Sequence, residues 1–128
     1  MLFCESDFGY FKNKELYIFG NYLAGTLPKE LGKLKKLERI DAYANHLEGT
    51  IPSELAKLPS LRYLDLHDNE FVGTMPKELC QKNLDMLIAD CHGRNPEVIC
   101  DCCNICCEGL PNMVCYDKKT GKLVDYAF

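Results

Sequence analysis

The stretch LRYLDLHDNEFVGTMPKEL, residues 61–79, is the third copy of a pattern that recurs about every 24 residues. The earlier copies are ELYIFGNYLAGTLPKEL at 15–31 and LERIDAYANHLEGTIPSEL at 37–55. A fixed period of about 20–50 residues is the signature of a repeat solenoid. Four residue types keep the same register in all three copies, in the sets Asn21, Asn45 and Asn69; Gly25, Gly49 and Gly73; Pro28, Pro52 and Pro76; and Leu31, Leu55 and Leu79.

The second copy shows what each unit can form. Leu37, Ile40 and Ala42 are apolar at spacings of three and two residues, and the alternation around Ile40 is typical of a short strand. Gly49 and Pro52 then exclude a long helix, which leaves a turn and a 3₁₀ or irregular return segment. No such unit can bury its apolar side chains alone, so we expect the units to stack and bury them against one another.

The third copy also resembles a known family. Its apolar positions, asparagine, glycine and proline follow the pattern LxxLxLxxNxLxGxIPxxLxxL of plant-type leucine-rich repeats, at Leu61, Leu64, Leu66, Asn69, Phe71, Gly73, Met75, Pro76 and Leu79. The resemblance implies a leucine-rich repeat solenoid of the α/β type, with mainly short parallel β-strands on a concave face where ligands bind. It covers about 3.5 repeats followed by a cysteine-rich C-terminal cap.

Departures from the pattern divide the chain into four parts. Residues 1–13 are expected to be a degraded N-terminal coil, and 14–83 contain the three repeats. Residues 84–107 are an atypical last repeat and cap, in which the register slips by one residue and His92 stands where an asparagine is expected. Residues 108–128 form a tail, either a hairpin turning at Thr120–Gly121 or a disordered end.

The asparagine ladder Asn21, Asn45 and Asn69 is expected to be structural. An inward amide at the end of each strand can donate to and accept from backbone groups of its own coil and of the next one. Leaving such buried groups unpaired costs about 1–3 kcal/mol per site. We therefore assign no catalytic or ligand-binding role to these three residues.

Eight of the nine cysteines lie in the last 49 positions: Cys80, Cys91, Cys100, Cys102, Cys103, Cys106, Cys107 and Cys115. Their even number and their place after the last repeat favour up to four disulfides, and we expect neighbouring cysteines to bond to different partners. Eight cysteines allow 105 connectivities, and the sequence does not choose among them. The alternative is a metal-thiolate site that binds zinc, because Cys103 and Cys106 have the spacing of zinc ligands. The last repeat with its cysteine run resembles the closing cap of secreted leucine-rich repeat proteins of microalgae.

Outward strand positions form the candidate ligand-binding face. In repeat register they make three columns: Tyr17, Asp41, Asp65 and Ile88; Phe19, Tyr43, His67 and Asp90; and Glu15, Arg39, Tyr63 and Met86, with Asp68 beside them. Aromatic anchors with a few charges are typical of protein recognition surfaces. The alternative is that these are only the soluble outward positions of strands. The sequence favours non-catalytic binding of a protein, a peptide or a glycan, with no cofactor.

An enzyme is the weaker interpretation. Asp41, Asp65, His67 and Asp68 could gather into a carboxylate–histidine patch. Repeat stacking alone explains why these residues come together. No serine or cysteine nucleophile lies near a histidine in an activating motif.

Charge and composition limit the partners and the compartment. The chain of 128 residues has a formal net charge of −4, which disfavours nucleic acid as the main partner because its phosphates attract clustered Lys and Arg. No apolar run approaches the ~20 residues of a membrane span, and the first residues lack the pattern of a signal peptide. The cysteine density indicates an oxidising compartment. We therefore expect an extracellular or receptor-like protein of which this chain is a C-terminal part, with Cys4 paired upstream or free.

Overall fold

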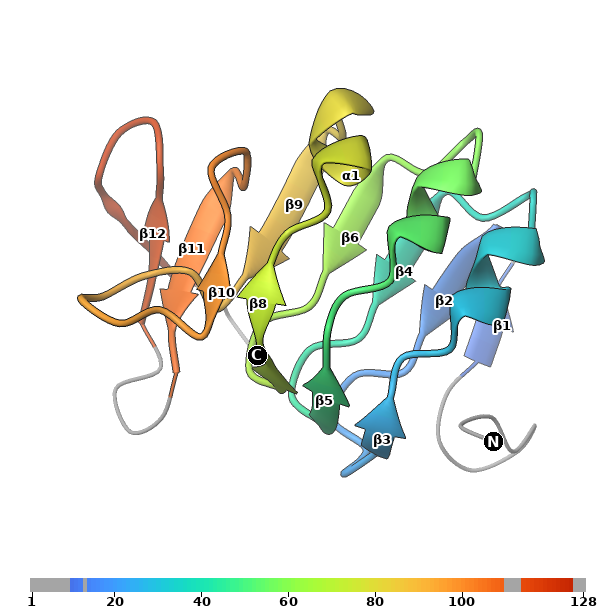
Figure 1. Ribbon diagram of the computed structural model, residues 1–128, viewed down its shortest axis with the longest axis horizontal. Coiled ribbons are helices and arrows are strands. Elements are labelled where there is room, and N and C mark those ends of the chain that lie inside the picture. The colour runs from blue at the N-terminus through green and yellow to red at the C-terminus, as the bar shows by residue number, and fades with distance from the viewer. Residues whose placement is uncertain (1–9, 13, 110–113, 126–128) are drawn as a thin grey trace.

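The computed structural model describes residues 10–12, 14–109 and 114–125. Its main element is an eight-stranded sheet that runs through the repeats and continues into the cap (Figure 1). The predicted region around Cys4 lies outside the described residues. In spatial order the strands of the sheet are β1 (Tyr10–Lys12), β2 (Glu15–Tyr17), β4 (Arg39–Asp41), β6 (Tyr63–Asp65), β9 (Met86–Ala89), β11 (Ile105–Glu108), β12 (Val114–Asp117) and β13 (Leu123–Val124).

The repeat spacing sets the register of the parallel strands. Leu16 pairs with Ile40 and Ile40 with Leu64, and each pair is one full repeat apart. Leu64 pairs with Leu87, which comes one residue earlier than a full repeat would place it. The one-residue slip of the fourth unit is therefore absorbed between β6 and β9, and the inward apolar column continues unbroken. The predicted solenoid of short parallel strands is confirmed.

A second layer closes each coil opposite the main sheet (Figure 1). It consists of two small parallel sheets and, at the upper edge in Figure 1, three short helices. Two of these helices are 3₁₀ and the third is one turn of α-helix. The elements are β3 (Ala24–Thr26), β5 (His46–Gly49) and β7 (Glu70–Phe71); β8 (Gly73–Thr74) and β10 (Val98–Ile99); and η1 (Lys29–Lys33), η2 (Ser53–Lys57) and α1 (Lys77–Gln81). Leucines from both layers fill the core between them.

The side chain of Asn45 joins two successive coils through hydrogen bonds at both of its polar atoms. Its Nδ2 donates to the carbonyl oxygens of Ile18 and Ala42, at 2.8 and 3.1 Å. Its Oδ1 accepts from the backbone N–H groups of Asn21 and Leu23, both at 3.0 Å. The buried amide thus satisfies the turn of the preceding coil and the strand end of its own coil.

Asn69 repeats this arrangement one coil further along. Its Nδ2 donates to the carbonyl oxygens of Ala42 and Leu66, and its Oδ1 accepts from the N–H of Leu47 at 3.0 Å. Asn21 is half-buried, and its amide donates to carbonyl oxygens of its own coil.

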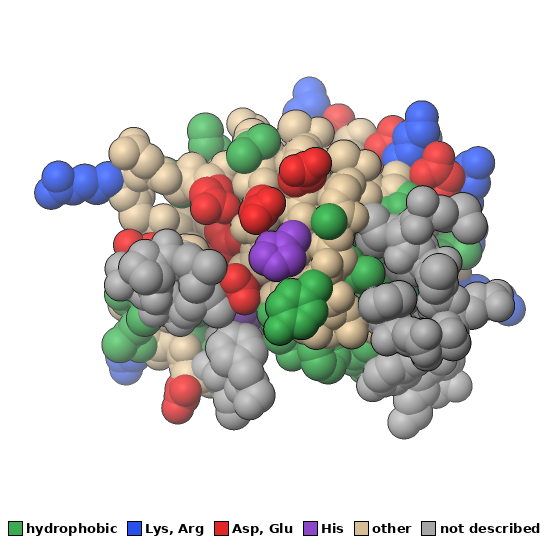
Figure 2. Space-filling view, turned by 90° about the horizontal axis from the view of Figure 1, so that it is seen from below, with side chains coloured by type: hydrophobic (Ala, Val, Ile, Leu, Met, Phe, Trp, Pro, Cys, Tyr) green, Lys and Arg blue, Asp and Glu red, His purple; other side chains and the backbone are tan. Residues whose placement is uncertain are grey.

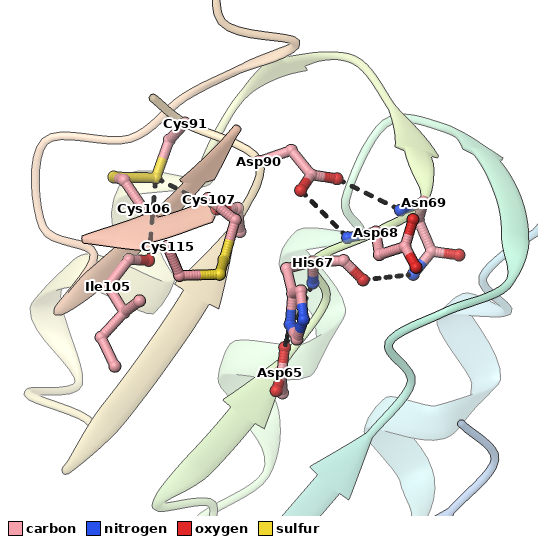
Figure 3. The surroundings of a disulfide bond; sticks show 11 residues. Asp65, His67, Asp68, Asn69, Asp90, Cys91, Ile105, Cys106, Cys107 and Cys115 are labelled. Atoms are coloured by element: carbon pink, nitrogen blue, oxygen red, sulfur yellow. Dashed lines mark hydrogen bonds and ion pairs between the residues drawn. A yellow bond between two sulfur atoms is a disulfide. The ribbon is translucent and has the colours of Figure 1, made fainter. Parts of the chain in front are cut away.

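The next step of this ladder is made by Asp90. Its Oδ1 and Oδ2 accept from the backbone N–H groups of Asp68 and Asn69, at 3.0 and 3.1 Å (Figure 3). His92, which register places in line with Asn69, is exposed and its ring stacks on Tyr116. The placement of Asp90 on the outward face was wrong, because the shortened fourth unit turns this carboxylate into the turn of the third.

Four disulfides close the C-terminal end, as predicted. They are Cys80–Cys102, Cys91–Cys106, Cys100–Cys103 and Cys107–Cys115. The neighbours Cys102 and Cys103 bond to different partners, as do Cys106 and Cys107. Histidine and cysteine ligand atoms do cluster here, in the sets His67, Cys107, Cys115 and Cys91, Cys100, Cys103. All these sulfurs are in disulfides, so the structure supports a disulfide cap and not the metal-thiolate alternative.

The cap extends the sheet beyond the parallel strands. β11 pairs in parallel with β9 and antiparallel with β12, and β12 pairs antiparallel with β13. The turn between β12 and β13 is held by the carboxylate of Asp117, which accepts from the N–H of Thr120 at 2.8 Å. Within the described ranges, no helix combines the length and the apolar character needed to cross a membrane.

Candidate ligand-binding face

The outer side of the eight-stranded sheet carries most of the predicted site residues. On β2, β4 and β6 the inward positions are Leu16, Ile40 and Leu64, so their neighbours point to the opposite side. We call this region the aromatic face, and it consists of Tyr17, Phe19, Arg39, Asp41, Tyr43, Tyr63, Asp65 and His67.

A column of stacked rings runs across three coils of the aromatic face. The rings of Phe19 and Tyr43 are 4.8 Å apart and nearly parallel, at 3°. Those of Tyr43 and His67 are 5.1 Å apart at 13°. Tyr17 meets Phe19 edge-on at 6.3 Å. The equal repeat length aligns these side chains, so each ring is held by the ring of the next coil.

Arg39 lies beside this column in a slot between two tyrosines. Its guanidinium carbon is 3.8 Å from the ring centroid of Tyr63 and 5.7 Å from that of Tyr17. Its Nε donates to Oδ2 of Asp41 at 3.0 Å. The side chain of Arg39 remains 34% exposed. The face therefore already seats one guanidinium by stacking and by a charged hydrogen bond.

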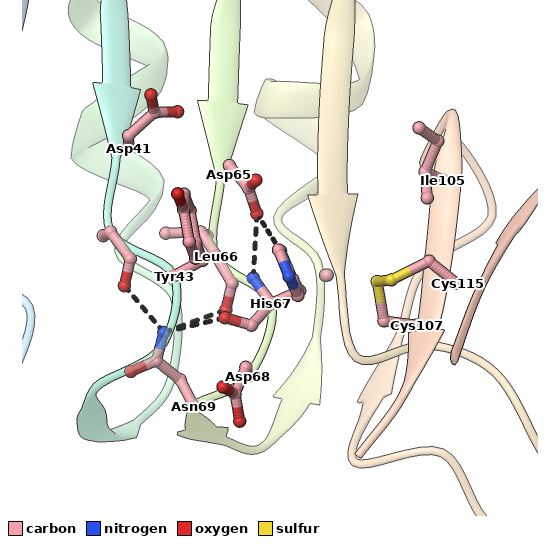
Figure 4. Close-up of polar contacts among 12 residues, drawn as sticks. Asp41, Tyr43, Asp65, Leu66, His67, Asp68, Asn69, Ile105, Cys107 and Cys115 are labelled. Atoms are coloured by element: carbon pink, nitrogen blue, oxygen red, sulfur yellow. Dashed lines mark hydrogen bonds and ion pairs between the residues drawn. A yellow bond between two sulfur atoms is a disulfide. The ribbon is translucent and has the colours of Figure 1, made fainter. Parts of the chain in front are cut away.

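Three polar members of the face are buried. Asp41, Asp65 and His67 are 3%, 1% and 1% exposed. The Asp65 Oδ1 lies 2.5 Å from Nδ1 of His67 and also accepts from the backbone N–H of His67 at 3.2 Å (Figure 4). These three residues are at outward strand positions, but their side chains are not exposed to solvent.

The predicted carboxylate–histidine patch is assembled only in part. Asp41 and Asp65 are direct cross-strand partners, and His67 adjoins Asp65. Asp68 sits in the following turn with φ 53°, and its carboxylate points away from the Asp65–His67 pair (Figure 4). The sulfurs next to His67 belong to the Cys107–Cys115 disulfide and offer no thiolate nucleophile.

The tyrosines of the face stay protonated over the physiological range. The hydrogen bond from the Tyr17 hydroxyl to Glu15 raises the pKa of Tyr17 to about 12. Burial, with the nearby Asp65 carboxylate, raises the pKa of Tyr63 to about 12. Burial also raises the pKa of Asp41, although Arg39 opposes this shift. The face thus presents neutral hydroxyls and ring faces around a buried acidic centre.

An apolar cluster borders the aromatic face on the cap side. Ile88, Ile105, Cys107 and Cys115 are buried there, and Tyr63 packs against them. Repeat register places Ile88 in an outward column but gives no position for the strand that brings the others beside it. A signal for this strand was present, because Ile105 and Cys107 alternate with Cys106 and so point to one side of a strand.

We call the region of Tyr22, His46 and Glu70, which follows the strands of the main sheet, the turn edge; its contacts differ from those of the aromatic face. The exposed ring of Tyr22 stacks on His46 at 6.1 Å, and Nδ1 of His46 lies 3.4 Å from Oε1 of Glu70. Figure 2 shows acidic side chains gathered beside a histidine on this side of the molecule. Tyr22 and His46 lie off the eight-stranded sheet, since His46 begins β5 in the second layer, so they are not members of the aromatic face.

Comparison with known proteins places the fold in a family. A family model described as Leucine Rich Repeat matches residues 14–34, 36–58 and 60–82. A search of curated proteins finds no match to the chain.

Solved structures of leucine-rich repeat proteins are similar to this chain. One is the ectodomain of the Arabidopsis thaliana membrane receptor kinase GASSHO1/SCHENGEN3 in complex with CASPARIAN STRIP INTEGRITY FACTOR 2, at 35% identity and TM-score 0.57 over 59% of this chain and 9% of that one. A second is the Arabidopsis receptor kinase HAESA with the peptide hormone IDA and the co-receptor SERK1, at 39% identity and TM-score 0.52 over 56% and 12%.

A third similar structure comes from a bacterium. It is a leucine-rich repeat protein of Leptospira interrogans, at 32% identity and TM-score 0.54 over 69% of this chain and 20% of that one. The chain thus spans at most 20% of any of these three proteins. From the repeat match over more than half of its residues and from the fold, the chain belongs to the leucine-rich repeat family.

Proposed function

We propose that this chain is a non-catalytic binding module that recognises a protein or peptide on its aromatic face. The observation that carries the proposal is the continuous stack of Phe19, Tyr43 and His67, flanked by Arg39 between Tyr17 and Tyr63. Aromatic residues and Arg are the side chains that dominate binding energy at protein interfaces. Here they lie together on one side of one sheet.

Rigidity of the face favours binding. Each ring of the stack is held by a neighbour from the next coil. A ligand therefore orders few side chains when it binds, and ordering each one would cost about 0.5–1.5 kcal/mol.

The neighbours and the disulfides support the same proposal. Two of the similar structures are plant receptor kinases in complex with CASPARIAN STRIP INTEGRITY FACTOR 2 and with a peptide hormone. Four disulfides suit an oxidising compartment. We place the chain in the extracellular part of a receptor-like or secreted protein.

A displayed library of random peptides, panned against the disulfide-intact protein, tests the proposal. We expect peptides to be captured, and Tyr43→Ala to weaken the binding of the selected peptides at least tenfold because it removes the central ring of the stack. Tyr22→Ala is the matched control, since this 84% exposed tyrosine lies on the turn edge. Thermal unfolding of both variants checks that they fold.

Three outcomes would count against this proposal. A library that yields no binder contradicts a peptide-binding role. Equal binding by Tyr43→Ala and Tyr22→Ala places the site elsewhere. Binding of glycans on an array, without binding of peptides, contradicts the assignment of the ligand class.

A further inference from the structure

We propose that Asp41 and Asp65 form a subsite for a cationic side chain of the ligand, a guanidinium or an ammonium group. This inference rests on the proposed function, because it names the chemistry that the aromatic face selects. The two residues are direct partners on β4 and β6. Neighbouring strands lie ~4.8 Å apart, so the two carboxylates stand next to each other.

Within the described residues, one oxygen of this pair lacks a donor. Arg39 donates to Oδ2 of Asp41, and both hydrogen bonds to Asp65 go to its Oδ1. The Oδ1 of Asp41 is buried and has no hydrogen-bond partner in the described part of the chain. Native proteins pair nearly all their buried polar atoms. A buried carboxylate oxygen without a donor, beside a second carboxylate, therefore points to a missing cationic donor.

The surroundings suit a guanidinium or an ammonium group. Arg39 already stacks on Tyr63, which shows that ring faces here accept a cation. Tyr43 and Tyr63 are half-buried and flank the acidic pair. Figure 4 shows the Asp41 and Asp65 side chains on adjacent strands with the Tyr43 ring beside them. A guanidinium carries five donors in a flat fork, enough to reach Oδ1 of Asp41 and the neighbouring carboxylate of Asp65 together.

Charge balance also favours an added cation. Asp41 and Asp65 are acidic, as is the adjoining Glu15, and Arg39 is the one permanent cation among the members of the aromatic face. Like charges directly opposite on neighbouring strands destabilise a sheet. A ligand cation would reduce this repulsion, so its binding would stabilise the face itself.

Access requires a side chain to move. Both carboxylates are almost fully buried, whereas the side chain of Arg39, which is bonded to Asp41, is 34% exposed. Outward rotation of Arg39 would release its Oδ2 partner and open the pair. The incoming cation would donate to Oδ1 of Asp41 and to the carboxylate of Asp65 beside it.

The test uses N-acetylarginine methylamide as a probe and N-acetylcitrulline methylamide as its neutral match in size and shape. Ring signals of Tyr43 and Tyr63 are followed by NMR during titration into the disulfide-intact protein. We expect shifts with the arginine compound only. Asp41→Asn and Asp65→Asn should each weaken this binding at least tenfold, whereas Glu48→Gln, an exposed acid on β5, should leave it unchanged.

Failure of this inference is distinguishable from failure of the proposed function. Equal shifts with both compounds, no shift with either, or full arginine binding by Asp41→Asn would overturn the cationic subsite. So would library peptides that depend on Tyr43 but lack Arg and Lys and bind Asp41→Asn normally, and that result would leave peptide recognition standing. Unfolding temperatures of the Asn variants check that a loss of binding is not a loss of folding.

Discussion

The repeats and the cap continue one sheet, but they satisfy their ends by different chemistry. In the repeats, the amides of Asn45 and Asn69 pass hydrogen bonds from each coil to the next, above a core of leucines. In the cap, Asp90 and Asn104 still accept from backbone N–H groups of the preceding coil, and four disulfides add covalent links. A repeat that is followed by a similar repeat can share its buried polar groups with it. A terminal unit has no following repeat, and here it is closed by covalent links.

The largest expected effect is the loss of stability in the repeats caused by Asn45→Ala. The substitution removes the oxygen that accepts from the N–H groups of Asn21 and Leu23, whereas the carbonyl of Ile18 keeps the side-chain amide of Asn21 as a donor. At about 1–3 kcal/mol for each buried unpaired group, we expect a loss of about 3 kcal/mol or more in the free energy of unfolding. Urea unfolding measures it.

The control for Asn45→Ala is Asn95→Ala, at an exposed position in the cap. It should change stability by less than about 0.5 kcal/mol, the usual range for surface substitutions. A similar small effect at Asn45 would contradict the structural role of the ladder.

The architecture of the repeats could be predicted from the sequence because spacing alone sets it. A fixed period with one buried Leu or Ile at the centre of each strand leaves a single register that keeps these side chains inside, and Leu16, Ile40 and Leu64 pair in that register. The same spacing locates the shortened fourth unit, since Leu87 stands one residue short of a full repeat after Leu64.

The cap and the burial of the site could not be predicted in the same way. An even number of cysteines indicates disulfides, but pairing depends on how the chain folds back between Cys91 and Cys115. Periodicity tells which side of the sheet Asp65 and His67 occupy, but not how deeply each is buried. The role of Asp90 was missed because a shorter unit brings a carboxylate to the place that an asparagine one full repeat after Asn69 would have taken.

Removing two disulfides separately tests how the cap is held. Cys80–Cys102 spans 22 residues and ties the last repeat to the cap, whereas Cys100–Cys103 spans 3. The chain-entropy relation gives stabilisation of about 3 kcal/mol for the longer loop and about 2 kcal/mol for the shorter. We therefore expect the double variant C80S/C102S to unfold at lower urea than C100S/C103S.

The two variants serve as controls for each other, since each removes two cysteines. Free-thiol titration should find no more thiols in either variant than in the unsubstituted protein, because the other three disulfides stay intact. If C100S/C103S is the less stable variant, then packing of the buried Cys100 and Cys103 sulfurs outweighs loop closure, and the cap is held by its core more than by its covalent links.

The smallest expected effect is the pH dependence of stability that comes from Asp90. This residue lies where the repeats meet the cap and takes the place of a ladder asparagine. Burial raises its pKa from the usual 3.8 to about 6, against the hydrogen bonds from Asp68 and Asn69, which lower it. Between these two values the folded protein binds more protons at this carboxyl than the unfolded chain does. Stability from this group is therefore present below about pH 4 and is lost as the pH rises to about 6, by about 1–3 kcal/mol in all.

Asp90→Asn should remove that pH dependence, because an amide does not titrate and its one oxygen can accept from turn N–H groups as Oδ1 of Asn45 does. Urea unfolding at pH 4 and pH 7 should show a smaller difference in Asp90→Asn than in the unsubstituted protein, and Asp101→Asn, an exposed acid of the cap, should behave like the latter. An equal difference in all three proteins would mean that Asp90 is ionised throughout, with its two backbone donors outweighing its burial. In that case the negative charge of Asp90 would be the difference between this last ladder residue and the neutral asparagines of the repeats.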